Sequence, residues 1–375
     1  MLSILFIISE DWYFVSHRLF LAKAAIMSGN KVVLLSHFTE HRDIIEAEGI
    51  KTIDWPLDRS SKNPFKEIDA LKKVFSTIRK LQPSIIHSVG MKPVLYSAIA
   101  SVFAGFKKNI FALAGLGYVF TSNNKSAKLL RPLLEGVFKL IFRGKKKRLI
   151  LQNPEDKNAL LSANIINPNN VRLIRGAGVD TQSFNVKPIP SPPPIITLPS
   201  RMLWAKGIQD FIVCAKEINK VSKIARFVLV GSPDVQNPDA IPIEMLEDWN
   251  NNGVVEWWGH QNNMPNVLHQ STIVCLPTSY GEGLPKCLLE AASCGRPIVT
   301  YDVPGCREIV IDGYNGYLVE PKSVDGLVGA ISKLLNDREL CIKMGKNGRK
   351  LVEKHFTQEK IAKETMAVWE ELLAS

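Results

Sequence analysis

The sequence lacks the features that define several common classes of protein. No uninterrupted apolar run reaches the roughly 18 residues that a bilayer-spanning helix needs. The first residues, MLSILFIISEDWYF, contain no basic segment and include Glu10 and Asp11, so we expect no signal peptide there. The six cysteines all lie in the second half without a CxxC pair, which favours reduced thiols over a disulfide framework or zinc site. These absences predict a cytosolic protein.

Acidic residues are scarce in the first half of the chain. Residues 1–180 carry a net charge of +13 and the remainder −2, and between Arg59 and Arg148 there are 19 Lys and Arg against 3 Asp and Glu. Such a basic half suits nucleic acid, a phosphorylated substrate or an anionic membrane surface. Apolar residues make up 46% and charged residues 22% of the 375 positions, which is typical of a protein with a folded core.

Short apolar runs alternate with helical stretches in both halves. Because the runs are continuous and do not alternate with polar residues, they predict parallel strands in sheets covered by helices on both faces. Strands are predicted at residues 3–8, 31–36, 84–89, 109–114, 148–152, 170–174, 195–199, 227–231, 254–258, 273–277 and 297–300, and helices at 17–27, 64–81, 207–220 and 285–294.

Residues 184–194 contain five prolines in eleven positions and are predicted to form a stiff linker. The linker separates two predicted α/β Rossmann-like domains, residues 1–183 and 195–356. A helix over residues 357–375 is expected to pack back on the first domain. Two such domains would face each other across a cleft at the carboxyl ends of their sheets, where parallel sheets bind ligands.

The most informative stretch is YGEGLPKCLLEAASCGRPIVT, residues 280–300. Seven residues lie between Glu282 and Glu290, Gly283 allows a ligand to approach the backbone, and Pro285 suits the start of a helix. Free N–H groups and the positive dipole end make a helix start an anion site. An isolated pair of glutamates at this spacing is usually a pair of surface carboxylates, but the flanking GEGLP, CGRPIVT and PGCREIV favour a binding site.

With these flanks the segment resembles the donor-binding segment of the family-4 retaining glycosyltransferases of GT-B fold. The resemblance extends to SRMLWAKG at 200–207 and RGAGVD at 175–180. In the first half, SVGMKP at 88–93 and AGLGYVFTS at 114–122 resemble the branch that extends capsular and lipid-linked oligosaccharides. The resemblance implies that the first domain binds an acceptor and the second a nucleotide sugar.

The resemblance also implies a donor site built from several loops. Arginine suits phosphate oxygens as a fork and lysine as a point charge. The implied contacts are Arg201 and Lys206 to the donor diphosphate, Glu282 with the backbone of Gly283 and Leu284 to the sugar and its phosphate, Pro285 at the helix start, Glu290 to the ribose, and the turn at Gly259 beside the base.

Transfer with retention needs little from a protein base, because the leaving phosphate oxygen can take the acceptor proton. The main task is to stabilise the diphosphate, which Arg201, Lys206 and the helix dipole can do. The sequence has no D-x-D motif, the metal–phosphate signature of the other large glycosyltransferase fold, so we expect no essential metal and no cofactor. His37 and His41 are spaced i, i+4 without a carboxylate at ligand spacing and are predicted to be surface residues.

The first domain departs from the family pattern at two places. Many relatives carry a histidine after the strand that precedes GLG, where this sequence has Ala112-Leu113-Ala114. His17 is the other catalytic candidate, against the alternative of a plain helix-surface histidine. The loop at residues 9–12 departs from the paired glycines common in the family, so a direct contact of this backbone with phosphate does not follow from the resemblance.

The stretch at residues 123–148 mixes apolar and basic residues and ends in Lys145, Lys146, Lys147 and Arg148. It is either a helix lying on anionic lipid or a domain helix with a solvated basic face. Nucleic-acid binding is disfavoured, since no nucleic-acid motif accompanies the charge.

The prediction is therefore a metal-independent hexosyltransferase, cytoplasmic and peripheral on the inner face of the cytoplasmic membrane. It would move a hexose or N-acetylhexosamine from a UDP-sugar to a polyprenyl-diphosphate-linked oligosaccharide in bacterial surface-glycan or glycoprotein-glycan assembly. The alternatives are a GT-B sugar-nucleotide epimerase and a catalytically idle sugar-nucleotide-binding protein at the membrane surface. Product analysis with and without an acceptor separates transfer from epimerisation.

Overall fold

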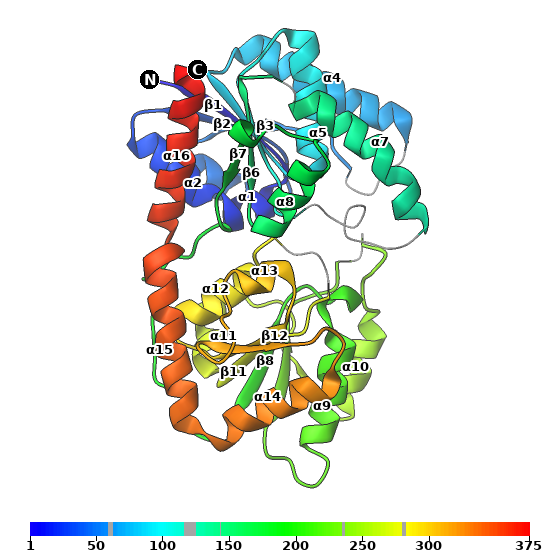
Figure 1. Ribbon diagram of the computed structural model, residues 1–375, viewed down its shortest axis with the longest axis vertical. Coiled ribbons are helices and arrows are strands. Elements are labelled where there is room, and N and C mark those ends of the chain that lie inside the picture. Colours follow the sequence, from blue (N-terminus) through cyan, green and yellow to red (C-terminus); the bar gives the residue numbers. More distant parts are fainter. Residues whose placement is uncertain (59–62, 116–124, 143, 235–236, 280–282) are drawn as a thin grey trace. The chain divides into compact units, whose positions relative to one another are not determined.

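A computed structural model of the chain describes residues 1–58, 63–115, 125–142, 144–234, 237–279 and 283–375, without the side chains of residues 125–130, 133 and 134. The chain divides into two compact units (Figure 1). The first unit comprises residues 1–178 together with 358–375, and the second comprises residues 179–357.

The first unit is built on a seven-stranded parallel sheet with the strand order β3-β2-β1-β4-β5-β6-β7. The chain moves outward from β1 to β3 and then returns to the other side of β1, so the topological switch point lies between β1 and β4. The strands are β1 (Ser3–Glu10), β2 (Lys31–His37), β3 (Lys51–Asp54), β4 (Ile85–Val89), β5 (Asn109–Ala112), β6 (Lys147–Leu151) and β7 (Val171–Leu173).

Helices cover both faces of this sheet, because the side chains of its central strands are apolar on both sides. Ile4, Phe6 and Ile8 of β1 pack with α2 and α16, whereas Leu5 and Ile7 pack with α4 and α5. Figure 1 shows α2 and α16 side by side on one face and α4, α5 and α7 on the other. The helices are α1 (Asp11–His17), α2 (Leu19–Met27), α3 (Arg42–Ala47), α4 (Pro64–Leu81), α5 (Met91–Ala104), α7 (Lys125–Phe142), α8 (Pro154–Ser162), the 3-10 turn η1 (Pro168–Asn170) and α16 (Gln358–Ala374).

The C-terminal helix α16 is held on the first unit by buried and charged contacts. Glu371 accepts hydrogen bonds from Arg148 Nε at 2.9 Å and Arg172 Nε at 2.8 Å, which ties the helix to β6 and β7. Trp369 is buried and donates from Nε1 to Nδ1 of His87 on β4 at 3.1 Å. The last helix therefore completes the core of the first unit.

The second unit contains a six-stranded parallel sheet in the order β10-β9-β8-β11-β12-β13, which confirms the predicted class of two parallel α/β sheets. Its strands are β8 (Ile195–Pro199), β9 (Arg226–Val230), β10 (Glu256–Trp257), β11 (Ile273–Leu276), β12 (Ile298–Tyr301) and β13 (Gly316–Val319). Its helices are η2 (Trp204–Lys206), α9 (Ile208–Ile218), α10 (Ile243–Asn251), α11 (Met264–Gln270), α12 (Lys286–Ser293), α13 (Pro304–Arg307), α14 (Val324–Asn336) and α15 (Arg338–His355).

The proline-rich segment at residues 184–194 is not a linker between the units, which corrects the prediction. It belongs to the second unit, and the boundary falls between Gly178 and Val179. Three arginines bind its backbone carbonyls: Arg296 donates to Lys187 and Pro188, Arg338 to Ile189 and Pro190, and Arg349 to Phe184. Since proline-rich backbone cannot satisfy itself in a helix or sheet, these side chains supply its partners.

Glu371 gives a direct test of how α16 is attached. Replacing it in Glu371→Gln should lower the free energy of unfolding by about 1–2 kcal/mol, because the buried Arg148 guanidinium loses its carboxylate while part of the site stays solvated. Chemical denaturation measures the change. The neighbouring Glu370→Gln is the matched control, since Glu370 is exposed, and it should change stability by less than about 0.5 kcal/mol. Equal stability of the two variants would contradict this account.

Candidate functional site

The motifs of the second half meet at the carboxyl edge of the second sheet. β8 and β11 are neighbours at the point where the strand order reverses, which is the position at which open α/β sheets bind ligands. The loop after β8 carries Arg201 and Lys206, and the loop after β11 leads through Gly283 and Pro285 into α12. The sheet topology therefore brings two of the predicted donor-binding segments to one edge.

These two loops touch closely at Gly207. A Cβ at this position would lie 1.9 Å from the carbonyl oxygen of Pro277, and the φ of +76° is in the left-handed region. The loops are also joined by the Ser279 N–H, which donates to Ala205 O at 3.2 Å, and by the Thr278 hydroxyl, which donates to the same oxygen at 3.2 Å. The residue before Gly207 is Lys206, so this contact fixes the lysine beside the loop that precedes α12.

The ends of β9 and β10 extend the same edge. At Gly231 an added Cβ would lie 1.9 Å from Ser200 O, so the end of β9 lies directly against the loop of Arg201. The Gly231 N–H donates to Gly259 O at 2.8 Å, and Trp257 Nε1 donates to Gly231 O at 2.9 Å. The turn at Gly259 is thus linked through Gly231 to the arginine loop.

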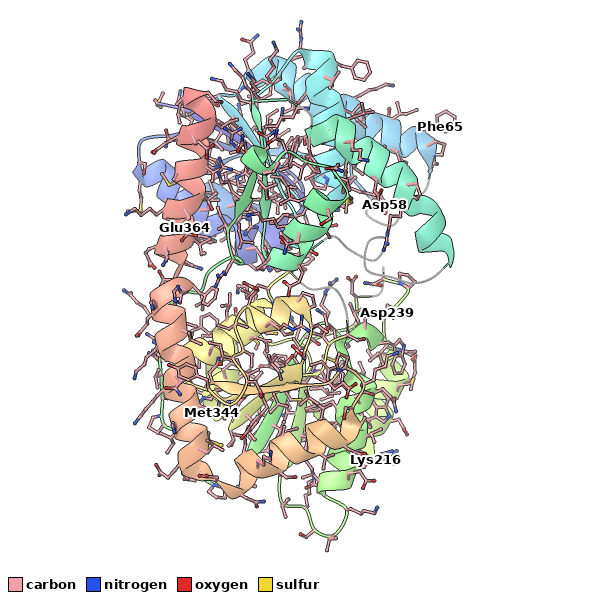
Figure 2. The ribbon with its side chains drawn as sticks, in the orientation of Figure 1. Asp58, Phe65, Lys216, Asp239, Met344 and Glu364 are labelled. Atoms are coloured by element: carbon pink, nitrogen blue, oxygen red, sulfur yellow. The ribbon has the colours of Figure 1, made fainter. Side chains whose placement is uncertain are left out.

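Arg201 has an acidic partner that the sequence analysis missed. Its Nη1 donates to Oδ2 of Asp234 at 2.7 Å, while its side chain remains 44% exposed. The backbone of the same loop is held by Asp239, whose carboxylate accepts from the Ala205 N–H at 2.8 Å (Asp239 is labelled in Figure 2). Asp234 lies in the PDVQNPD loop after β9, and loop residues distant in sequence give no pattern from which such a pairing could be predicted.

Glu290 is the fifth residue of α12, and its side chain is buried. Its carboxylate pairs with Lys286 one turn earlier, and the Lys286 ammonium lies 5.9 Å from the centre of the Phe184 ring. Pro285 is the N-cap of α12, so the predicted helix start is one residue early. Leu284 is also buried, whereas Glu282 lies outside the described residues.

In the first unit, residues 9–12 were predicted to form a loop. In the structure they form the end of β1 and the start of α1. The buried Asp11 carboxylate accepts from the backbone N–H of Thr39 at 2.7 Å, of Trp12 at 2.8 Å and of His41 at 3.0 Å. Burial raises the pKa of Asp11, but these hydrogen bonds and the Thr39 hydroxyl outweigh burial and hold it below its usual value. Asp11 therefore stays ionised and joins the loops after β1 and β2.

His17 is the last residue of α1. Its ring stacks on Tyr13 with centroids 4.2 Å apart, and its Nδ1 lies 2.6 Å from the Ser16 hydroxyl. The next residue, Arg18, is buried and was not among the predicted site residues. In the sequence it differs from its neighbours only as a basic residue inside an apolar helical segment.

The four basic residues at positions 145–148 differ in how far they are exposed to solvent. Lys145 and Lys146 are exposed, as a membrane contact requires. Lys147 and Arg148 begin β6, which corrects their assignment: Arg148 is buried and pairs with Glu371, and Lys147 Nζ donates to Ile141 O at 2.6 Å. Burial lowers the pKa of Lys147. The last two cluster residues therefore serve the core of the first unit.

The described residues form neither a metal-binding cluster nor a membrane-spanning helix. In the described ranges, no three His, Cys, Asp or Glu side chains come together as a metal site would need. No helix among these residues has both the length and the apolarity of a bilayer span. All six cysteines are free thiols.

Family models match most of the chain. The model described as "Glycosyl transferases group 1" matches residues 179–351, and the model described as "Glycosyl transferase 4-like" matches residues 3–153. With the two parallel-sheet units and their loop sites, these matches define a glycosyltransferase of GT-B fold. Within that class, the chain belongs to the group 1 glycosyltransferases with a glycosyl transferase 4-like first half.

Two relatives align along most of their length. The chain is 27% identical to the N,N'-diacetylbacillosaminyl-diphospho-undecaprenol alpha-1,3-N-acetylgalactosaminyltransferase of Campylobacter jejuni, over 88% of each chain. It is 26% identical to the UDP-Gal:alpha-D-GlcNAc-diphosphoundecaprenol alpha-1,3-galactosyltransferase of Escherichia coli, over 78% of this chain and 76% of the relative.

Solved structures share the fold over the whole chain. The sucrose-phosphate synthase of Thermosynechococcus elongatus has a TM-score of 0.80 at 20% identity, with 100% of both chains covered. Anabaena Alr3699/HepE in complex with UDP and glucose has a TM-score of 0.79 at 16% identity, covering 99% of this chain and 100% of that one. At these identities the likeness establishes the fold alone.

The contact at Gly207 predicts a large loss of stability for a single methyl group. Gly207→Ala should lower the free energy of unfolding by about 2–4 kcal/mol, because the methyl would overlap the Pro277 carbonyl and the left-handed φ is strained for alanine. The control is Gly329→Ala in the middle of α14, where nothing lies within 4 Å of the added carbon. Helix propensity should make that variant more stable by up to about 1 kcal/mol. Denaturation showing equal effects at both glycines would disprove the contact.

Proposed function

We propose that this glycosyltransferase moves a hexose or N-acetylhexosamine from a UDP-sugar to a polyprenyl-diphosphate-linked oligosaccharide. The reaction proceeds with retention, as in glycosyltransferase family 4, and without an essential metal. The observation that carries the proposal is the meeting of the Arg201–Lys206 loop with the loop preceding α12, at the switch point of the second sheet. That edge supplies cationic side chains and a helix N-terminus where a diphosphate leaving group would develop charge.

The acceptor class is proposed from the two relatives. Both are named for transfer to a sugar that is linked through a diphosphate to undecaprenol, one adding N-acetylgalactosamine and the other galactose. Both align with this chain over about three quarters or more of their length, so acceptor and donor halves are both included. A polyprenyl-diphosphate acceptor for this chain is the simplest extension of that shared chemistry.

Arg201 is the proposed clamp for the donor diphosphate. A guanidinium carries five N–H donors, and its ion pair with Asp234 uses Nη1. The Asp234 contact fixes the orientation of the arginine before substrate binds, which reduces the entropy lost on binding. Lys206, held by the Gly207 contact, adds a second positive charge from the same loop.

Glu290 is the proposed ribose ligand, and Glu282 the proposed ligand of the transferred sugar. The Glu290 carboxylate is buried and oriented by Lys286, and a carboxylate accepts hydrogen bonds from two vicinal hydroxyls. Gly283, Leu284 and the turn at Gly259 complete the proposed donor site. His17 remains a proposed catalytic residue of the first unit.

We also propose that the protein is peripheral on the inner face of the cytoplasmic membrane. An amino-edge patch is formed by the exposed Val102, Phe103 and Leu140 together with Lys107, Lys145 and Lys146. These residues precede β5 and β6, which are paired from Asn109 and Lys147 onward, so they lie at the same edge of the sheet. Exposed apolar side chains beside lysines suit insertion into an anionic lipid surface.

A transfer assay tests the proposed reaction. UDP-sugars are incubated with a short polyprenyl-diphosphate-linked glycan in excess EDTA, and products are analysed by mass spectrometry and, for anomeric configuration, by NMR. We expect one sugar added with retained configuration at an undiminished rate. Loss of activity in EDTA with recovery on adding Mg²⁺ or Mn²⁺ would refute metal independence. Conversion of the UDP-sugar without acceptor would indicate an epimerase.

Variants of the clamp test its residues in the same assay. Arg201→Ala and Lys206→Ala should each remove about 2–4 kcal/mol of transition-state stabilisation, as loss of one preorganised donor does. Lys216→Ala is the control, since Lys216 is an exposed lysine of α9 in the same unit (Figure 2). Values of kcat/KM within about threefold of the unsubstituted protein in both clamp variants would rule out the clamp.

Vesicle binding tests the amino-edge patch. The double variants Val102→Ser/Phe103→Ser and Lys145→Gln/Lys146→Gln should each reduce sedimentation with phosphatidylglycerol-containing vesicles. Each lysine contributes about 1 kcal/mol at low salt, and salt screens this term. Val221→Ser is the control, because Val221 is 98% exposed in the second unit. Unchanged binding of both double variants at low salt would remove the patch from consideration.

A further inference from the structure

A small cavity in the first unit lies between the sheet and the helices α2 and α16. It is lined from the carboxyl ends of β5, β6 and β7 by Ala112, Gln152 and Gly176, from the α1–α2 junction by Arg18, and from α16 by Thr365. His87 of β4 also lines it. This is the edge at which parallel sheets bind ligands, but in the unit that does not carry Arg201 and Lys206.

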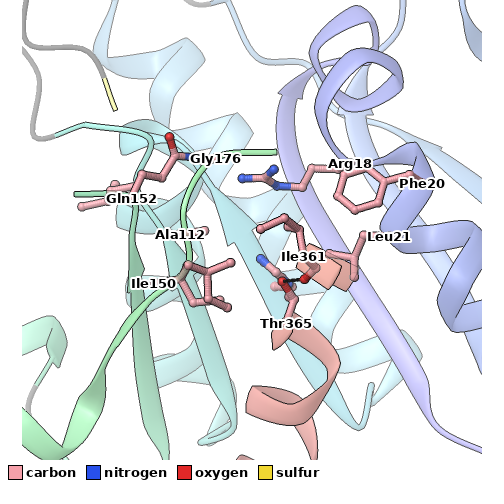
Figure 3. Close-up of a pocket in the computed structure, with 12 residues that line it drawn as sticks. Arg18, Phe20, Leu21, Ala112, Ile150, Gln152, Gly176, Ile361 and Thr365 are labelled. Atoms are coloured by element: carbon pink, nitrogen blue, oxygen red, sulfur yellow. Dashed lines mark hydrogen bonds between the residues drawn. The ribbon is translucent and has the colours of Figure 1, made fainter. Parts of the chain in front are cut away.

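Arg18 places a buried charge in this cavity. It is only 6% exposed, and Figure 3 shows its guanidinium pointing into the pocket while Gln152 reaches in from the opposite side. Its Nη1 donates to the His17 carbonyl at 2.8 Å. Among the residues that the structure describes, no carboxylate pairs with Arg18, and none of those lining the cavity is acidic. Burial lowers the pKa of the guanidinium, but arginine still remains charged.

His87 contributes a second donor. It is 1% exposed, and its Nδ1 accepts the hydrogen bond from Trp369 Nε1, so the proton of the neutral ring is on Nε2. Burial and the nearby Arg18 lower the pKa of His87 to about 3, which keeps the ring neutral at physiological pH. Its Nε2 is buried with no hydrogen-bond partner in the described structure. An unsatisfied buried N–H is unfavourable and points to a missing oxygen ligand.

The start of α2 also lines the cavity. Phe20 and Leu21, in the first turn of this nine-residue helix, line the cavity beside Arg18, which is the N-cap. Because α1 ends at the same residue, the negative dipole end of α1 offsets the positive end of α2 there. The guanidinium and the imidazole N–H are therefore the two groups that favour an anionic oxygen.

We propose that this cavity binds an oxygen of a phosphate group, and that Arg18 and His87 are its ligands. The space measures about 10 Å³, which accommodates one water-sized atom, so one phosphate oxygen enters and the rest of the ligand stays outside. The phosphate is the diphosphate of the lipid-linked acceptor, because Arg201 and Lys206 of the other unit are assigned to the donor diphosphate. This assignment of the ligand rests on the proposed function.

Calorimetry with farnesyl diphosphate, a short soluble lipid diphosphate, tests the site. UDP is present at saturation to fill the donor site, and farnesol serves as the uncharged control ligand. The unsubstituted protein should bind farnesyl diphosphate and not farnesol. Arg18→Gln should weaken the binding at least about tenfold, as loss of a charge-assisted hydrogen bond does. The control Arg79→Gln replaces an exposed arginine of α4 and should bind normally.

The other outcomes decide against the proposal in different ways. Equal affinity of Arg18→Gln and the unsubstituted protein would overturn the site. Weakened UDP binding in Arg18→Gln with unchanged farnesyl diphosphate binding would assign the phosphate to the donor and overturn the acceptor assignment. Removal of an uncompensated buried charge should leave the melting temperature equal or higher; a variant that fails to fold would show that Arg18 is structural.

The binding test is independent of turnover. If the unsubstituted protein transfers no sugar but binds farnesyl diphosphate through Arg18, the proposed function fails and the phosphate site stands. If transfer occurs and Arg18→Gln has an unchanged acceptor KM, the function stands and this inference fails. In an active enzyme we expect Arg18→Gln to raise the acceptor KM about tenfold while the UDP-sugar KM stays the same.

Discussion

The second unit of this glycosyltransferase depends on two backbone contacts that leave no room for a side chain. Gly207 lies against the Pro277 carbonyl, and Gly231 lies against the Ser200 carbonyl. These contacts bring the loops after β8, β9 and β11 together at one edge, and the position of Arg201 and Lys206 follows from them. The ion pair of Arg201 with Asp234 and the hydrogen bonds to Asp239 then fix the loop in place. Packing between main-chain atoms thus determines where the loop that carries Arg201 and Lys206 lies.

The first unit uses buried charge in two contrasting ways. The Asp11 carboxylate accepts hydrogen bonds from the backbone N–H groups of Thr39, Trp12 and His41. Arg148 forms an ion pair with Glu371. Both charges therefore join elements of the first unit to one another. Arg18 has no such carboxylate among the described residues, and it lies at the sheet edge where ligands bind. This contrast between Arg148 and Arg18 is the basis of the proposed phosphate site.

Local sequence predicted much of the fold, and what it missed depended on tertiary contacts. The strand Ile195–Pro199 and the helix Pro64–Leu81 have the predicted bounds, because an uninterrupted apolar run and a proline-started amphipathic pattern are local signals. The edge strand β3 (KTID) was missed since it has no apolar run. The proline-rich segment was misassigned because the arginines that hold it, Arg296 and Arg338, lie more than 100 positions later. For the same reason, neither the Asp234 partner of Arg201 nor the role of Arg148 could be predicted.

The return of the chain to the first unit determines the order in which the protein can be completed during synthesis. Residues 1–178 leave the ribosome first, yet their sheet lacks α16, with its buried Trp369 and Leu372, until residues 358–375 have been made. Residues 179–357 are continuous and contain their whole core, so they can fold while the earlier unit still exposes the apolar face that α16 covers. The unit that is translated first is therefore the last to be finished.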